Sequence, residues 1–215
     1  MKQNQFGRSM IEMLGVLAII AVLSVGGIAG YSKAMFMWHS NRQRDLLETL
    51  FSNVVALKSN LSSVKEHDSQ TITYVFEAMG GVPEGFIYKN NKIYGLDNEV
   101  ITVTYGVQSD KQEDGSILRK FKYAVRITFN FEQGNVALIV QEYCKNIVFA
   151  AQQIPNEVLY VAFASSGNTF NNQNFKTLYS SIGLKTATLA DINQKCKLVS
   201  DLSGAGYFMI DFNPN

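Results

Sequence analysis

The most constraining feature of this sequence is an uncharged run that extends from Met13 to Ser32. Most residues of the run are apolar, and a helix of about 20 such residues spans the hydrocarbon core of a bilayer. One carboxylate, Glu12, stands immediately before the run, and Arg8 lies four residues before Glu12. The run therefore predicts a membrane-spanning helix close to the N-terminus.

The position of the small residue that precedes this helix is unusual for a signal sequence. A secretory signal peptide is cleaved after its apolar core, at small residues. Here Gly7 precedes the core, so that cleavage after it would leave the apolar helix on the mature chain with Glu12 as the fifth residue. This arrangement resembles the N-terminus of type IV pilins and type II secretion pseudopilins over about residues 1–35. Arg8 departs from the family pattern, because the mature chain usually begins with Phe or another apolar residue.

The resemblance implies a fold class and a division of the chain. The expected fold is α+β and pilin-like, with a long N-terminal helix packed on a small antiparallel β-sheet domain. The segments are a leader peptide, a transmembrane and filament-core helix, the amphipathic half of the same helix and a globular domain, at residues 1–7, 8–32, 33–65 and 66–215. The implied partners are the membrane, a prepilin peptidase that cuts between Gly7 and Arg8, other pilin subunits and the pilus assembly machinery. No cofactor and no metal site are expected.

Glu12 has two interpretations. Ser9 and Glu12 have the S-x-x-E form of a capping box, in which the carboxylate satisfies free N–H groups at the start of a helix. An ionisable group at the edge of a membrane span is, however, a functional hypothesis by default. Cleavage would free a positive α-amine at Arg8, and Glu12 of a neighbouring subunit is its natural partner. Given the resemblance, we expect Glu12 to serve assembly.

Three glycines, Gly26, Gly27 and Gly30, lie near the end of the span. Each lowers helix stability by about 1 kcal/mol relative to Ala, so together they predict a soft segment. Small residues also let helix backbones approach closely in a membrane. The sequence leaves both interpretations open.

Beyond the span, an apolar stripe with helical spacing continues. Its members are Leu47, Leu50, Val54, Leu57, Leu61 and Val64. The stripe predicts one unbroken helix from about Ser9 to Leu61, whose second half packs against the globular domain. Trp38 lies where this helix leaves the span, a position that suits the membrane interface, although it could equally fill a core.

The rest of the chain alternates between helical and strand-like patterns. A short helix capped by Asp68 or Ser69 and stopped by Gly80 and Gly81 is expected over 68–79. Strands are expected over 92–94, 100–105, 122–129, 158–164 and 207–212, with 100–105 paired to 122–129 across a polar hairpin loop. Helices are expected over 135–153 and, with a T-x-x-D cap, over 188–195. The segment after 164 is expected to be a long polar loop.

Cys144 and Cys196 are the only cysteines. An even pair in an exported domain predicts a disulfide, whereas two cysteines in a cytosolic protein would more often be inert thiols. Basic residues flank both ends of the span, so charge bias does not orient it. An inner-membrane topology with the N-terminus inside and the C-terminus outside rests on the resemblance and on the cysteine pair, as does an extracellular or periplasmic filament.

Several functional classes receive no support from the sequence. His39 and His67 belong to no metal-ligand or nucleophile motif and are interpreted as solvated surface residues. A net charge of +1 gives no general attraction to nucleic acid. Asp110, Glu113 and Asp114 lack the spacing of a calcium loop, so a solvated turn is expected there. We therefore expect a protein that is not an enzyme.

The leading hypothesis is a structural subunit of a type IV pilus or a pseudopilus. The alternative is a monomeric binding module, in which an uncleaved anchor displays an adhesin-like domain. The combination of Gly7 with Glu12 favours the subunit, because an anchor that does not assemble needs neither residue. The sequence does not choose among adhesion, motility, DNA uptake and secretion as the task of the filament.

Overall fold

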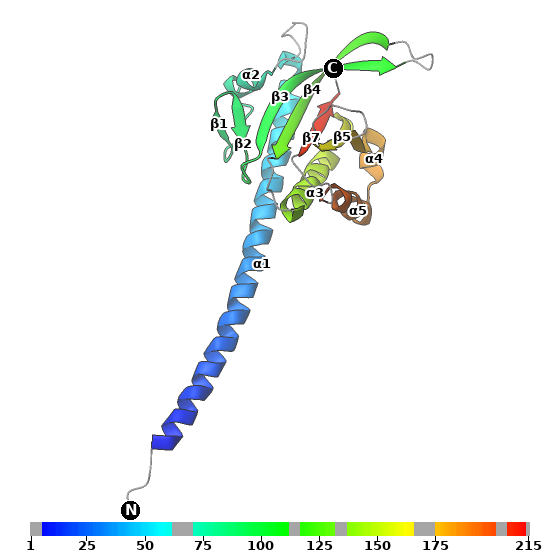
Figure 1. Ribbon diagram of the computed structural model, residues 1–215. Coiled ribbons are helices and arrows are strands. Elements are labelled where there is room, and N and C mark those ends of the chain that lie inside the picture. Colours follow the sequence, from blue (N-terminus) through cyan, green and yellow to red (C-terminus); the bar gives the residue numbers. More distant parts are fainter. Residues whose placement is uncertain are drawn as a thin grey trace, which may run out of the picture. The chain divides into compact units, whose positions relative to one another are not determined.

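The computed structural model of the protein describes residues 6–61, 71–111, 117–131, 137–165, 175–200 and 206–213 (Figure 1). The chain divides into two compact units, Met1–Asn41 and Arg42–Asn215. Helix α1 (Phe6–Leu61) is unbroken and contributes residues to both units. The expected long helix is therefore confirmed, although it begins three residues before Ser9.

The second unit is built on a mixed-length antiparallel sheet of seven strands in the described part of the chain. The strand order is β1-β2-β3-β4-β7-β5-β6, and every neighbouring pair is antiparallel. The strands are β1 (Ile87–Lys89), β2 (Lys92–Tyr94), β3 (Val100–Lys111), β4 (Ile117–Phe131), β5 (Val158–Ser165), β6 (Phe175–Ser180) and β7 (Gly206–Phe212). The remaining helices are α2 (Thr73–Ala78), α3 (Ala137–Gln153), α4 (Ser181–Thr186) and α5 (Leu189–Ser200). The predicted α+β class is confirmed.

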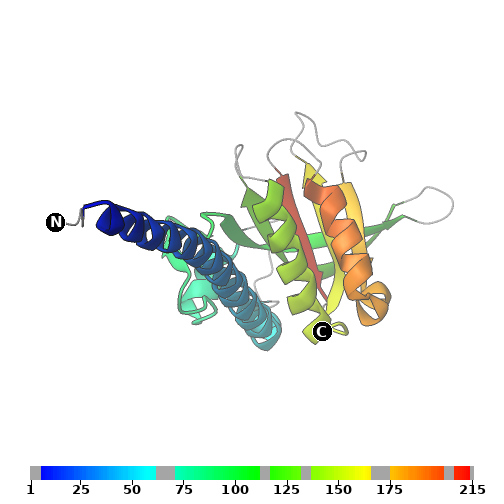
Figure 2. The same ribbon diagram turned by 90° about the horizontal axis from the view of Figure 1, so that it is seen from below.

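One face of the sheet carries the helices of this unit. Phe51 on α1 meets Phe129 and Phe212 edge-on, with ring centroids 6.3 and 5.6 Å apart. Tyr143 on α3 meets the same Phe129 at 5.5 Å. The second half of α1 and helix α3 therefore share one core layer, and Figure 2 shows α3 and α5 side by side across the sheet. The predicted stripe supplies Leu47, Leu50 and Val54 to this core, where all three are buried.

The β3–β4 hairpin follows the expected alternation. On β4, Ile127 and Phe129 are buried, whereas Thr128 between them is half-buried on the opposite face. The predicted pairing of these strands is confirmed, with Thr102 opposite Thr128. Both strands are longer than predicted, because the ladder continues to Lys111 and Ile117. Asp110 is consequently a strand residue rather than a loop residue, and Glu113 and Asp114 lie outside the described residues.

The short helix predicted over 68–79 begins later than expected. Thr71 pairs with Thr104 as an isolated bridge, and the Ile72 N–H donates to the Val103 carbonyl at 2.8 Å. These contacts hold the backbone against β3, so α2 starts only at Thr73. Asp68 and Ser69, the predicted caps, lie outside the described residues.

The predicted stop of this helix is confirmed. Gly80 has φ +74°, a left-handed conformation that favours glycine. The Gly81 N–H donates to the Phe76 carbonyl at 2.9 Å, which is the pattern of a glycine-terminated helix.

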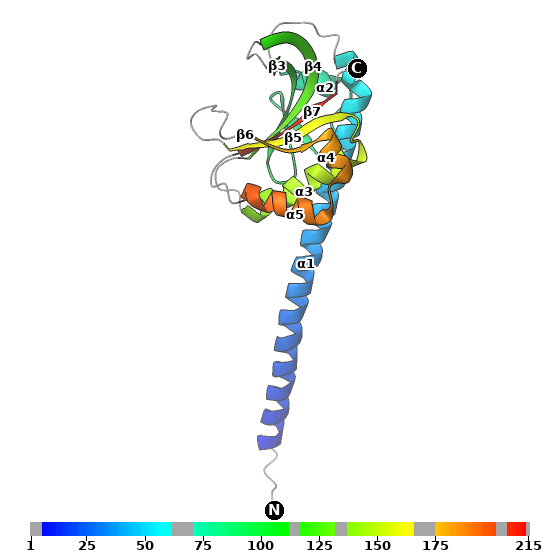
Figure 3. The ribbon, with the colours of Figure 1, turned by 90° about the vertical axis from the view of Figure 1, so that its right-hand side faces the viewer.

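The polar loop predicted after β5 is only partly correct. Residues 166–174 lie outside the description, but β6 then pairs with β5 through Val161 and Tyr179, and α4 follows (Figure 3). The Ser180 hydroxyl accepts from the Gly183 N–H at 3.2 Å and caps α4. Sequence reasoning missed β6 because the Asn-rich composition before it favours a loop, whereas the strand is stabilised by pairing with β5.

Strand β1 was also missed. Asn90 and Asn91, between β1 and β2, have φ values of 52° and 56°. Two successive residues with positive φ form the tight turn that best matches the twist of a hairpin, and Asn tolerates that conformation. The signal was present in the sequence as two Asn residues between short β-rich segments.

Candidate functional site

The first candidate site is the apolar segment of α1 that lies in the N-terminal unit. Every residue from Met10 to Trp38 is exposed, including Ile11, Leu23 and Ile28 at 73%, 68% and 68%. A helix that is apolar all round is one that a bilayer or other helices cover. By length and composition this helix is apolar enough to cross a membrane, a criterion that a signal sequence near the N-terminus also meets. The segment is therefore suited to act as a membrane anchor.

Glu12 is the one acidic residue among the first 44 residues, and it is exposed in the second turn of α1. Gly7 and Arg8 lie in the first turn, and the Arg8 side chain is outside the description. Because α1 begins at Phe6, Ser9 does not occupy the cap position of the uncut chain, so the capping-box interpretation does not apply to that form. The structure therefore places Gly7, Arg8 and Glu12 within two successive turns of one helix.

The glycines near the end of the span have open space around them among the residues that the structure describes. A Cβ added to Gly26, Gly27 or Gly30 would meet nothing within 4 Å. The Ser24 hydroxyl donates to the Ile20 carbonyl at 2.7 Å, which satisfies this polar group inside the helix. Close packing of these glycines, if it occurs, must therefore involve another helix.

The predicted cysteine pair is bonded. Cys144 on α3 and Cys196 on α5 form a disulfide with a Cα–Cα distance of 5.6 Å and a sequence separation of 52. Both residues are fully buried. The predicted T-x-x-D cap of α5 is also present, since the Thr188 N–H and hydroxyl both donate to Asp191. The bond therefore joins two helices that lie on the same face of the sheet.

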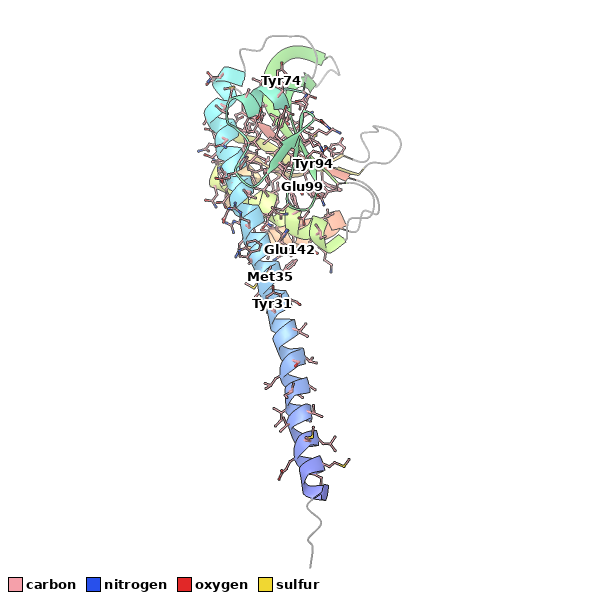
Figure 4. The ribbon with its side chains drawn as sticks, turned by 90° about the vertical axis from the view of Figure 1, so that its left-hand side faces the viewer. Tyr31, Met35, Tyr74, Tyr94, Glu99 and Glu142 are labelled. Atoms are coloured by element: carbon pink, nitrogen blue, oxygen red, sulfur yellow. A yellow bond between two sulfur atoms is a disulfide. The ribbon has the colours of Figure 1, made fainter. Side chains whose placement is uncertain are left out.

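A buried polar cluster in the globular unit was not predicted. Gln43 on α1 donates to Asp97 at 2.6 Å and accepts from Asn146 on α3 at 2.7 Å. The Tyr143 hydroxyl donates to Glu99 Oε1 at 2.8 Å, and the Asp97 N–H donates to Glu99 Oε2 at 2.8 Å. Glu99 is 1% exposed, and Figure 4 shows it among the packed side chains of this unit. We call these five residues the Glu99 cluster.

Burial raises the pKa of the Glu99 carboxyl from 4.5 to about 7, against the hydrogen bond from Tyr143, which lowers it. Burial also raises the pKa of the Tyr143 hydroxyl well above its ordinary value, and the nearby Glu99 carboxylate adds to this effect. Sequence reasoning missed Glu99 because a glutamate between two strand-like segments is typical of a solvated turn. Nothing in its local pattern indicates burial.

A second polar network lies on the opposite face of the sheet. Arg126 on β4 binds Asp211 on β7 through two hydrogen bonds of 2.6 and 2.8 Å, and Tyr160 on β5 donates to Asp211 at 2.6 Å. The hydrogen bonds to Asp211 raise the pKa of the Arg126 guanidinium, and burial raises the pKa of the Tyr160 hydroxyl. These three residues bridge neighbouring strands, and the arrangement is that of a structural ion pair.

The part of the chain that the structure describes holds no group of three or more His, Cys, Asp or Glu residues that could bind a metal ion. His39 is half-buried, whereas the sequence predicted a solvated residue, and His67 lies outside the described residues. Comparison with protein-family models, with curated proteins and with solved structures finds no match in any of the three.

Proposed function

We propose that this protein is a structural subunit of a type IV pilus or of a pseudopilus. In this proposal a prepilin peptidase cuts between Gly7 and Arg8, and α1 then leaves the bilayer to pack against the α1 helices of other subunits. The cytoplasmic membrane holds the subunit before assembly, with the globular unit on the outer side.

The observation that carries the proposal is the complete exposure of the uncharged run of α1 from Met13 to Ser32, which Glu12 immediately precedes. A simple anchor needs an apolar surface, but it gains nothing from Glu12, because an ionised group at the edge of the span disfavours insertion. A helix that moves from lipid into a bundle of identical helices can use such a group, since each copy also offers a positive α-amine after cleavage.

The proposed pairing follows from simple electrostatics. Cleavage after Gly7 would place the new α-amine at Arg8, close to one end of the apolar segment. Little water is present between helices, so an amine and a carboxylate attract each other strongly there. A charged group without a partner of opposite charge is costly in free energy at the same place. Register between subunits would then be set by contact of one subunit's Arg8 amine with another subunit's Glu12.

The test is a comparison of the unmodified chain with Glu12→Gln in cells that carry a prepilin peptidase and an assembly machinery. Mass spectrometry of the N-terminus reports cleavage, and electron microscopy of sheared cell surfaces reports filaments. We expect the Gln variant to be inserted and cut at Gly7 but absent from filaments, because each subunit would leave one amine unpaired. Breaking such a pair on one side typically costs about 3–5 kcal/mol.

The matched control is Glu48→Gln, which removes a carboxylate from the same helix at a solvent-accessible pair with Arg44. We expect normal filaments from this variant. An uncut chain in the presence of the peptidase would contradict the proposal and would favour the monomeric anchored module. Normal filaments from Glu12→Gln would show that assembly does not use the carboxylate.

A further inference from the structure

The connection between β2 and β3 is folded around its own glutamate. The Gly95 N–H donates to the Glu99 carbonyl at 3.0 Å, and the Asn98 N–H donates to the Gly95 carbonyl at 3.3 Å. Asn98 has φ 58°, which Asn tolerates better than most residues. A Cβ on Gly95 would overlap the Glu99 carboxylate, so glycine at this position is what allows the carboxylate to fold inward.

Two helices close over this turn. Helix α3 brings the Tyr143 hydroxyl to Glu99, and Gln43 of α1 bridges Asp97 to Asn146 of α3. All five members of the Glu99 cluster thus connect three separate segments of the globular unit through a continuous chain of hydrogen bonds. A change at Glu99 therefore acts on α1, on α3 and on the turn together.

The groups that face Glu99 carry no compensating positive charge. The titratable groups that act on it are Asp97 on its own turn and Tyr143 on α3, while α1 presents the neutral amide of Gln43. Within the described ranges, no Lys, Arg or His forms an ion pair with Glu99. When Glu99 is ionised, a negative charge is buried beside Asp97 without a cation.

The hydrogen bonds also define where a proton on Glu99 would reside. The Asp97 N–H is a fixed donor, so Oε2 must remain an acceptor. The proton therefore resides on Oε1, and the Tyr143 hydroxyl rotates to accept it. Both protonation states keep two hydrogen bonds to the carboxyl group, but only the protonated state avoids the buried charge.

From this geometry we infer that Glu99 is a proton-operated latch, which holds the 95–99 turn against α1 and α3 when protonated and loosens it when ionised. Because burial raises the pKa of Glu99 to about 7, the latch changes state near neutral pH. The carboxyl has a higher pKa when folded than when unfolded. Its contribution to stability is therefore complete below about pH 4.5 and is lost as the pH rises through about 7. This inference does not depend on the proposed function.

The experiment compares urea unfolding of the detergent-solubilised full chain with that of Glu99→Gln between pH 5 and 8. A Gln side chain mimics the protonated acid, because it accepts from Asp97 and donates to Tyr143. Relative to this variant, we expect the unfolding equilibrium constant of the unmodified chain to rise on the order of fifty- to a hundredfold over that range. The matched control is Glu142→Gln, which removes a carboxylate paired with Lys145 on the same helix α3 and should leave the pH profile unchanged.

A second variant and a local measurement separate the latch from a general effect on folding. Tyr143→Phe removes a donor that lowers the pKa of folded Glu99, so we expect the pH-dependent loss of stability to extend to higher pH. Hydrogen exchange, corrected for intrinsic rates, should show more frequent opening of residues 43–50 at pH 8 than at pH 6 in the unmodified chain only. Parallel pH profiles for the unmodified chain and Glu99→Gln would overturn the inference. So would equal opening of residues 43–50 at both pH values.

Discussion

At the scale of single residues, the described part of the chain has two fully buried carboxylates, and their surroundings differ. Asp211 is 1% exposed and is neutralised by two hydrogen bonds from Arg126. Glu99 is equally buried but is held by an uncharged hydroxyl and a backbone N–H. Burial without a cation raises the pKa of the Glu99 carboxyl to about 7, so that this group changes its charge within the physiological pH range.

The Arg126–Asp211 pair gives a direct prediction. Asp211→Asn keeps the shape of the side chain but leaves the guanidinium of Arg126, which is only 26% exposed, without its counter-charge. We expect the free energy of unfolding, measured by urea titration, to fall by about 2 kcal/mol. The pair of Arg44 with Glu48, whose side chains are 37% and 35% exposed, is the control, since Glu48→Gln should change stability by no more than about 0.5 kcal/mol. An Asp211→Asn protein as stable as its parent would show that the pair contributes nothing.

At the scale of elements, those with strong periodicity were predictable and those fixed by tertiary contacts were not. The alternation in β4 and the apolar spacing in α1 and α3 follow from which faces are buried, so the sequence carries that information. The start of α2 depends on the bridge between Thr71 and Thr104, and β6 depends on pairing with β5. Neither contact has a local signal. The burial of Glu99 depends on α1 and α3, which are distant from it in the sequence.

Substitution of the glycines near the end of the span can distinguish the two roles left open for this part of α1, which are flexibility and close packing against another helix. Ala and Leu have nearly equal helix propensity, so both should remove softness to the same extent. At Gly26, where an added Cβ meets nothing within 4 Å, Leu adds a large side chain, whereas Ala adds only a methyl group. We expect Gly26→Leu to abolish filaments and Gly26→Ala to retain them, as judged by electron microscopy, because close packing between helices is what the glycine permits. Val22→Leu, one turn earlier, is the control for a larger side chain in the span. Equal loss of filaments in Gly26→Ala and Gly26→Leu would indicate that the glycine serves flexibility.

The disulfide between α3 and α5 gives a prediction about stability. The bond closes a loop of 52 residues, and on the chain-entropy model its removal costs about 4 kcal/mol. We expect the double variant Cys144→Ser and Cys196→Ser to unfold at a markedly lower urea concentration. Thiol labelling of the unmodified protein under denaturing conditions should succeed only after reduction. Labelling without reductant would contradict the presence of the bond in the protein.

At the scale of the whole molecule, the sheet order places β7 between β4 and β5. Its buried residues include Phe208, Ile210 and Phe212. Phe212 meets Phe51 of α1, and Phe208 meets aromatic rings from β4 and β5. The strand therefore joins the two halves of the sheet and completes the core beneath the helices. Without β7, one edge of β4 and one edge of β5 would be unpaired, and the sheet face that carries α1 and α3 would be incomplete.

A truncation tests this dependence. A chain that ends at residue 205 lacks β7, and we expect it to show no cooperative thermal transition by circular dichroism. A chain that ends at Asn213 keeps every strand and the hydrogen bond from the Asn213 N–H to the Glu157 carbonyl. It should melt like the full chain. A cooperative transition in the shorter chain would show that β4 and β5 can close the sheet without β7.

The central place of β7 also determines the order in which the parts of the protein can fold during synthesis. A ribosome releases α1 first, so the apolar segment is available to a membrane while most of the sheet has not been synthesised. Strands β4 and β5 follow, but they do not acquire their shared neighbour until residues 206–212 have emerged. Pairing between such distant segments is slow, and open strand edges in the meantime invite mispairing. The apolar segment of α1 is thus complete early and the globular unit late, so a chain threaded through a membrane during synthesis would cross it before its sheet can close.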